Sequence, residues 1–236
     1  MNIDRQNKKD PKRAAFTLIE LLLVITIIGV LSGLVVGMAG FASRKMRDVR
    51  VNAELQNLVA AIENYKLQTG FYPPDNPRTD YTGTAAEKEW TRTTHHTLFY
   101  ELSGATFDGV TKSFQTLNES EAVAALDLET LGASTIANSA RERNRVPFRS
   151  ITFKASQYKE ICLPNKPEVD LELLVVPVPG PKMLDSVNET HQKIPKSINP
   201  WHYDASSTNR HNPNGFDLWA EYIAGGKTNI VGNWKD

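Results

Sequence analysis

The sequence has almost no cysteine and no excess of charge of either sign. Cys162 is the one cysteine among 236 residues, so an intramolecular disulfide framework is excluded. No nucleophile motif surrounds Cys162, and we expect a buried or incidental thiol. Lysine plus arginine and aspartate plus glutamate both number 27. Because nucleic-acid binding usually needs a basic excess, we expect no nucleic-acid partner.

Recognisable catalytic and metal-binding motifs are also missing. The sequence contains no Gly-x-Ser-x-Gly elbow and no phosphate-binding glycine loop. Its histidines do not have the helical spacing of hydrolytic zinc motifs. They are His95, His96, His191, His202 and His211. We therefore expect no metal site and no enzyme, while a catalytic site dispersed along the chain would carry no such signature.

One long apolar run dominates the N-terminus. Residues 16–41 are almost all apolar, and one carboxylate, Glu20, interrupts them. The run exceeds the roughly twenty residues that span a bilayer. Placing a carboxylate against lipid costs at least a few kcal/mol of free energy, so we expect Glu20 to have a function in this segment. A polar leader, residues 1–15, precedes the run and carries five lysines and arginines.

Two ordinary interpretations of this N-terminus stay open. A secretory signal would also have a basic start, an apolar stretch and small residues at a cleavage point, such as those at 37–43. The apolar run is longer than the apolar core of a usual secretory signal, however, and such a core would not normally contain a carboxylate such as Glu20. A plain signal anchor explains the length but not the hexapeptide FTLIEL at 16–21. Basic residues flank both ends of the run, so charge does not settle the orientation.

The leader followed by FTLIEL resembles the type IV pilin and type II secretion pseudopilin superfamily. That resemblance implies cleavage by prepilin peptidase between Ala15 and Phe16, followed by N-methylation of Phe16. Ala15 stands where the family usually has glycine, which makes efficient cleavage less certain. The resemblance also implies that Glu20 of one subunit meets the charged Phe16 terminus of a neighbour. Each charge would then compensate the other in the membrane.

Three glycines, Gly29, Gly33 and Gly37, recur at four-residue spacing within the apolar run. Small residues so placed let apolar helices approach closely in lipid. Glycine is also simply common in membrane helices, so both interpretations stand. Gly37 occupies the position where many pseudopilins have a proline that loosens the stem helix, and glycine weakens a helix by about 1 kcal/mol relative to alanine.

After the apolar run the pattern becomes amphipathic. Apolar residues recur at helical spacing between polar ones, namely Leu55, Leu58, Val59, Ile62 and Tyr65. We therefore predict one long helix from about Phe16 to Gln68. Gly70 and the following FYPP end it. This helix end resembles that of the major pseudopilin of type II secretion.

The middle of the chain, residues 75–198, is longer than the corresponding region of the usual major pseudopilin. Asn118 followed by Glu121 resembles a capping box and predicts a helix over residues 122–126. Residues 171–176 predict a short strand, which Pro177 ends. The resemblance gives no function for this insert.

The C-terminal segment again resembles the major pseudopilin, in NPW at 199–201, NPNGFDLW at 212–219 and GNW at 232–234. Residues 216–223 alternate as in a half-buried strand, after a turn at Asn214 and Gly215. The major pseudopilin commonly binds calcium in its last loop. Here residues 224–230 contain no carboxylate, so we expect no calcium there. Asp204, Asn209, Asn212 and Asp217 could rebuild a site from the next loop, although polar turn residues explain them more simply.

Together these features predict an α+β pilin-like fold in four segments. These are a prepilin leader (1–15), a transmembrane helix segment (16–42), its amphipathic continuation (43–70) and an extracytoplasmic globular domain (71–236). The resemblance implies a structural subunit of a type II secretion filament in the cytoplasmic membrane. Its partners would be prepilin peptidase, other copies, minor pseudopilins and an inner-membrane assembly platform with its ATPase. The alternatives are a type IV or minor pilin, and a membrane-anchored extracytoplasmic binding or enzymatic domain.

Overall fold

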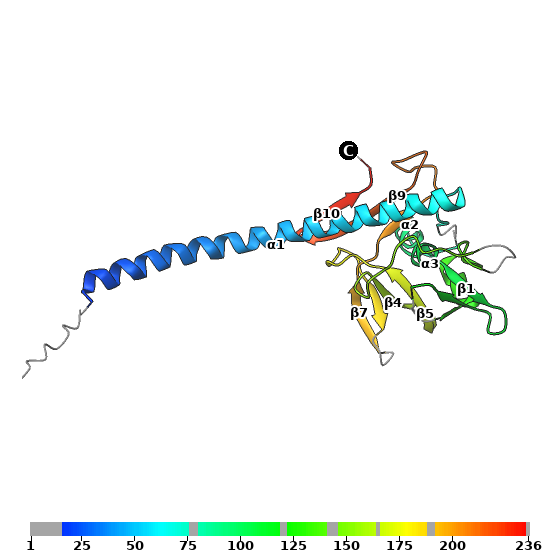
Figure 1. Ribbon diagram of the computed structural model, residues 1–236, viewed down its shortest axis with the longest axis horizontal. Helices are drawn as coiled ribbons and strands as arrows, with labels where there is room; N and C mark the ends of the chain where they lie inside the picture. Colours follow the sequence, from blue (N-terminus) through cyan, green and yellow to red (C-terminus); the bar gives the residue numbers. More distant parts are fainter. Residues whose placement is uncertain are drawn as a thin grey trace, which may run out of the picture. The chain divides into compact units, whose positions relative to one another are not determined.

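The computed structural model describes residues 16–75, 80–118, 122–140, 146–163, 166–187 and 192–234. The chain forms two compact units, Met1–Lys45 and Met46–Asp236. The helices are α1 (Leu18–Thr69), α2 (Ala85–Thr94), α3 (Leu98–Ser103), α4 (Ala125–Leu128) and the 3₁₀ turn η1 (Glu129–Leu131). Figure 1 shows α1 as the longest element of the chain.

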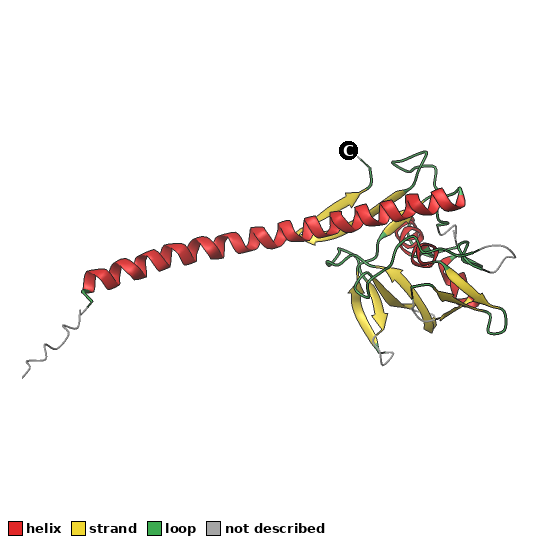
Figure 2. Cartoon of the chain, in the orientation of Figure 1, coloured by secondary structure: helices red, strands yellow, loops and turns green. Residues whose placement is uncertain are grey.

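Within the described ranges, ten strands form three antiparallel sheets, drawn in yellow in Figure 2. The first sheet has the order β1-β2-β3, with β1 (Ala105–Asp108), β2 (Ser113–Thr116) and β3 (Ala122–Ala124). The second has the order β5-β4-β6-β7, with β4 (Tyr158–Leu163), β5 (Lys166–Leu174), β6 (Leu184–Val187) and β7 (Lys193–Ile198). The third has the order β10-β9-β8, with β8 (His202–Asp204), β9 (Asp217–Ala224) and β10 (Lys227–Gly232).

The long helix agrees with the prediction to within two residues at each end. It spans 52 residues and stops before Gly70, whose φ of +85° is a conformation that glycine adopts without strain. Its second half buries one apolar stripe, formed by Val51, Leu55, Leu58, Ile62 and Tyr65. The spacing of these residues keeps them on one helix face, so this half packs on the globular core. The predicted fold class, α+β with a long N-terminal helix and antiparallel sheets, is confirmed.

A buried polar contact fixes the end of this stripe to the insert. The Tyr65 hydroxyl donates to Glu101 of α3 over 2.9 Å, and the backbone N–H groups of Ala137 and Asn138 donate to the same carboxyl group. Glu101 is 1% exposed. A buried carboxyl group without such donors would cost several kcal/mol, so these three contacts are required for its burial.

The third sheet contacts the second half of α1 near Asp48, within the Met46–Asp236 unit. The Tyr222 hydroxyl of β9 donates to Asp48 over 2.9 Å, and Arg47 donates to the Ile223 carbonyl over 3.5 Å. Figure 1 shows β9 and β10 running beside this part of α1. Trp201, just before β8, is 1% exposed and belongs to the core.

Some local predictions for the globular unit are confirmed and one is wrong. Strands β5 and β9 confirm most of the predicted strands at 171–176 and 216–223, although Val175 and Val176 lie beyond the end of β5 and Phe216 precedes β9. The predicted helix at 122–126 is instead strand β3 followed by the short α4. Asn118 caps no helix, because its side chain accepts the N–H of Phe153 over 2.9 Å. Pairing with β2 buries Val123, and that burial outweighs the local helix signal.

Helix α2 was not predicted, although its start carries a sequence signal. Thr84 accepts the N–H of Glu87, and the Glu87 carboxylate accepts the N–H of Thr84 over 2.8 Å. This reciprocal pair is a capping box, recognisable as Thr-x-x-Glu.

Candidate processing and assembly site

The predicted processing point lies at the start of the described chain. Phe16 and Thr17 precede α1, and Phe16 is 83% exposed. Ala15 and the leader at 1–15 lie outside the described residues. Because Phe16 is exposed, a processing enzyme can reach it. Cleavage before Phe16 and methylation of its amino group stay predictions.

Glu20 has partners within its own chain. Its carboxylate accepts the N–H and the hydroxyl of Thr17, each over 2.8 Å, and the Thr17 hydroxyl accepts the N–H of Glu20 over 3.3 Å. Thr17 is thus the N-cap of α1 and Glu20 its third residue, which completes a capping box. Sequence reasoning missed this use of Thr17, although the Thr-x-x-Glu spacing indicates it. Charge pairing between Glu20 and Phe16 of another copy stays a prediction.

The apolar part of α1 has its side chains exposed. From Leu18 to Phe41 the large apolar residues with described side chains are 47–87% exposed. Length and composition make α1 the one described helix able to cross a membrane. A Cβ placed on Gly29 or Gly33 would meet no atom within 4 Å. Gly37 lies in α1, but its surroundings are not described. The helix therefore offers an apolar surface to lipid or to other helices.

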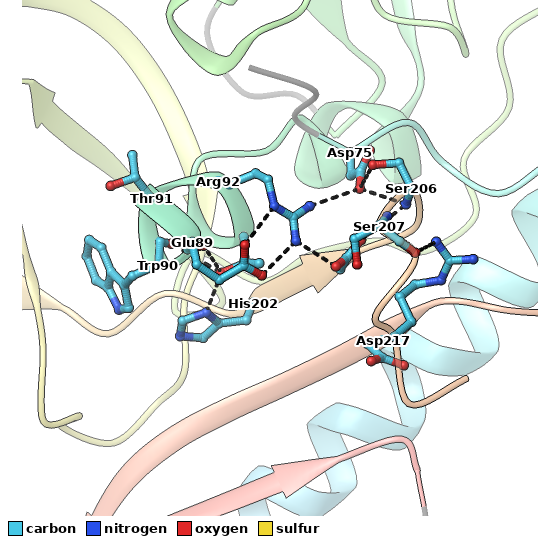
Figure 3. A network of polar contacts seen from close by, with 12 residues as sticks. Asp75, Glu89, Trp90, Thr91, Arg92, His202, Ser206, Ser207 and Asp217 are labelled. Carbon is cyan, nitrogen blue, oxygen red and sulfur yellow. Dashed lines mark hydrogen bonds and ion pairs between the residues drawn. The ribbon is translucent and has the colours of Figure 1, made fainter. Parts of the chain in front are cut away.

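The globular unit contains a network around Arg92 of α2. Its guanidinium donates to Glu89 over 2.8 Å and to Asp204 over 2.6 Å, and lies 3.7 Å from Asp75. Figure 3 shows Arg92 between Asp75 and Glu89. Burial opposes the charge on Arg92, but the hydrogen bonds to Glu89 and Asp204 outweigh it and raise its pKa. No local pattern predicts this network, because its members are up to 129 positions apart, from Asp75 to Asp204.

Three of the four residues considered for a rebuilt calcium site, Asp204, Asn212 and Asp217, form hydrogen bonds within the protein. Asp204 accepts Arg92 and the N–H groups of Ser206 and Ser207. Burial works against its charge, yet the Arg92 and Ser207 contacts hold the pKa of Asp204 at about 2. Asp217 accepts the N–H groups of His211 and Asn212 over 2.6 and 3.0 Å. Among the residues that the structure describes, no group of three or more His, Cys, Asp or Glu side chains is placed to hold a metal ion.

Two histidines are buried and neutral in this region. Burial lowers the pKa of His96 to about 4 and that of His202 to about 3. The His202 ring contacts the Thr93 hydroxyl over 2.8 Å, and the His96 ring contacts the Trp201 carbonyl over 3.2 Å. His191 lies outside the described residues. The His202 contact joins β8 to α2, and the His96 contact joins the segment after α2 to the residue before β8, so both histidines have a structural role.

An exposed apolar N-terminal helix with a glutamate in its first turn, followed by antiparallel sheets, is the arrangement of a type IV pilin-like or pseudopilin subunit. Residues 10–36 match the family model of the prokaryotic N-terminal methylation motif. Neither the curated proteins nor the solved structures contain a match to the chain. The motif supports the pilin-like class, whose members are structural subunits and not enzymes. It implies processing by prepilin peptidase and assembly with other pilin-like subunits.

Proposed function

We propose that the protein is a pseudopilin of a type II secretion system, most like the major pseudopilin. The observation that carries this proposal is the convergence of the three C-terminal motifs on one sheet. Asn199 donates to the carbonyls of Val178 and Glu221, both over 2.9 Å. Asn233 accepts the N–H of Leu218 over 2.9 Å and the side chain of Asn212 over 3.3 Å. Motifs separated in sequence thus form one structural unit beside α1.

Processing prepares the subunit for assembly. Prepilin peptidase cuts between Ala15 and Phe16 on the cytoplasmic side, and the new amino group of Phe16 is then methylated. The apolar helix stays attached and holds the subunit in the cytoplasmic membrane, with the globular unit on the extracytoplasmic side. The test is intact mass measurement with N-terminal sequencing of the protein from its own host. A chain beginning at N-methylated Phe16 supports the proposal. A start near Phe41 indicates an ordinary signal, and an intact Met1 a simple anchor.

Assembly follows from the apolar surface of α1. Subunits stack with a stagger, so that Glu20 of one copy faces the Phe16 ammonium of the next. Gly29, Gly33 and Gly37 permit close helix approach within the filament. The subunit itself supplies no motor chemistry. An inner-membrane assembly platform with its ATPase supplies that energy, and minor pseudopilins are further partners.

A type IV pilin or minor pilin is the alternative. Many type IV pilins close a C-terminal loop with a disulfide, which a chain with Cys162 alone cannot form. Deletion of the gene in its host separates the two functions. Loss of protein export with surface pili and DNA uptake intact supports a pseudopilin, whereas loss of pili or DNA uptake with normal export contradicts it. A membrane-anchored binding domain of another class would leave both unchanged.

We also propose that the globular unit folds without calcium. The β9–β10 connection is a two-residue turn with Ala224 opposite Lys227, and it contains no carboxylate. In the preceding loop, Arg210 donates to the carbonyls of Ser207 and Pro213. Backbone carbonyl oxygens are ligands that calcium can use, but these two already accept hydrogen bonds from the Arg210 guanidinium. Adding EDTA or calcium should therefore leave the melting temperature of the full chain unchanged, and a calcium-dependent rise would contradict this proposal.

A further inference from the structure

We propose that cations at the base of the globular unit form a contact surface for anionic lipid headgroups. This basal cationic surface consists of Arg47 and Arg50 on α1 and Lys227 on β10, and all three residues are exposed. The inference rests on the proposed function, because it requires the apolar helix to be anchored in a membrane with the globular unit outside the cytoplasm.

Two contacts between α1 and the neighbouring strand, β9, hold Lys227 near the α1 cations. Arg47 donates to the Ile223 carbonyl over 3.5 Å, and Tyr222 donates to Asp48 over 2.9 Å. Ala224, the next residue of β9, is paired with Lys227. Arg50 follows Arg47 by three positions and so lies on the same side of the helix. The tertiary structure thus places Lys227, from the C-terminal part of the chain, near Arg47 and Arg50 of α1.

The β9–β10 turn restricts where Lys227 can lie. Gly225 and Gly226 have φ values of +62° and +75°. Two successive residues in this region form the tight turn that joins neighbouring antiparallel strands, and glycine adopts it without strain. No longer loop intervenes between β9 and β10, so the backbone of Lys227 stays beside that of Ala224.

Chain connectivity places the start of the surface at the membrane boundary. The predicted transmembrane segment ends at residue 42, and Arg47 follows five positions later within α1. At a helical rise of about 1.5 Å per residue, that separation is about 7.5 Å. The polar headgroup region on each side of a bilayer is about 5–8 Å deep. Arg47 therefore lies at headgroup depth or just beyond it.

The side chains between these cations also suit an interface. Met46 and Val49 are 67% and 57% exposed, and they alternate along α1 with Arg47 and Arg50. Exposed apolar side chains mixed with cations are typical of helix segments at the membrane surface. Asp48, the acidic residue among them, accepts the Tyr222 hydroxyl. Cations on the extracytoplasmic side run against the positive-inside rule, so topology alone does not explain them.

The test uses the full chain in bilayers of phosphatidylcholine with added phosphatidylglycerol. Spin-labelled versions of the two lipids report which headgroup associates with the protein. We expect a preference for phosphatidylglycerol of up to about fivefold for each cation at low salt. The double variant Arg50→Gln with Lys227→Gln should lose most of it, and raised salt should abolish it in the wild type. Arg47 is left intact because it contacts Ile223. Lys88→Gln, at an exposed cation of α2, is the control for loss of a positive charge elsewhere on the globular unit and should keep the preference.

Equal lipid preference in the double variant and in Lys88→Gln would overturn the proposal. So would a preference for phosphatidylglycerol that persists undiminished in high salt. If the double variant keeps the lipid preference but loses assembly in the host, the surface serves a protein partner instead, which also contradicts the proposal. Extraction of the wild-type chain from both bilayers by alkaline carbonate would show that membrane anchorage itself is wrong. That result separates failure of the proposed function from failure of this inference.

Discussion

Glu20 has one role that the structure shows and a second role, in assembly, that is proposed. Within one chain its carboxylate accepts two hydrogen bonds from Thr17 and caps α1. Between copies it is proposed to pair with the Phe16 ammonium. The cap needs an acceptor oxygen, whereas the pairing needs a negative charge. A neutral residue of the same shape therefore separates the two roles.

We expect Glu20→Gln to be cleaved normally but to assemble poorly, because its amide oxygen can still accept from Thr17 while the charge is gone. Glu20→Val should also lose the contacts from Thr17 to the residue 20 side chain, at a cost of about 1 kcal/mol to the helix start, while Thr17 still accepts the backbone N–H of residue 20. The measurements are mature mass, methylation and filament cross-linking in the host. Normal filaments from Glu20→Gln would contradict charge pairing, and normal filaments from Glu20→Val would contradict any assembly role for Glu20.

Tyr65 is the residue whose hydroxyl connects α1 to the insert. Tyr65→Phe removes one of the donors to Glu101, and a hydrogen bond to a buried carboxyl group is worth about 1.5–3 kcal/mol. We expect the free energy of unfolding of the full chain in detergent to fall by that amount. Tyr72→Phe is the matched control, because its hydroxyl contacts Glu63 at an exposed position over 3.2 Å. An equal loss of unfolding free energy in Tyr65→Phe and Tyr72→Phe would show that the buried Tyr65–Glu101 hydrogen bond stabilises the protein no more than the exposed one.

At the scale of elements, the end of β10 packs against a residue that follows it, Trp234. The indole of Trp234 stacks on the His211 ring with centroids 4.0 Å apart. A Cβ on Gly232 would lie 2.8 Å from three atoms of the same indole. Glycine at position 232 therefore lets the end of β10 approach Trp234 closely.

Gly232→Ala should displace Trp234 and destabilise the third sheet by about 1–3 kcal/mol, as overpacking does elsewhere. Tryptophan fluorescence should shift towards that of exposed indole, and chemical denaturation measures the loss of stability. Gly109→Ala is the control, because a Cβ there would meet no atom within 4 Å. Unchanged fluorescence and stability in Gly232→Ala would show that Trp234 does not depend on this contact.

At the scale of the whole molecule, buried histidines make stability depend on pH. Burial lowers the pKa of His96 and His202 from 6.5 to about 4 and about 3. The unfolded chain takes up protons below pH 6.5 while the folded chain does not. The stability contribution is therefore fully present above pH 6.5 and declines as pH falls towards 4.

The expected slope reaches about 1.4 kcal/mol per pH unit for each histidine. Asp204, with its pKa near 2, adds a further loss below its ordinary value of 3.8. Chemical denaturation of the full chain across this range measures the slope. His202→Asn can still contact Thr93 but cannot titrate, so its slope should be shallower. A wild-type stability that stays constant from pH 6.5 to 4 would contradict the neutral burial of both histidines.

The sequence by itself determined the features that depend on neighbouring residues. The apolar run, FTLIEL and the stripe from Leu55 to Tyr65 predicted the N-terminal class and the extent of α1, because helical periodicity and membrane length are local properties. The strands at 171–176 and 216–223 were predictable for the same reason. The capping boxes at Thr17 and Thr84 are local patterns too, since each is recognisable in the sequence as Thr-x-x-Glu.

Tertiary structure decided what depends on residues distant in sequence. It replaced a locally favoured helix at 122–126 with β3, since pairing with β2 buries Val123. It also brought Arg92 to Asp75 and Asp204, and β9 to Arg47 and Asp48 of α1, contacts that no local pattern encodes. Burial and long-range pairing depend on how the whole chain packs, and only the folded protein specifies that packing.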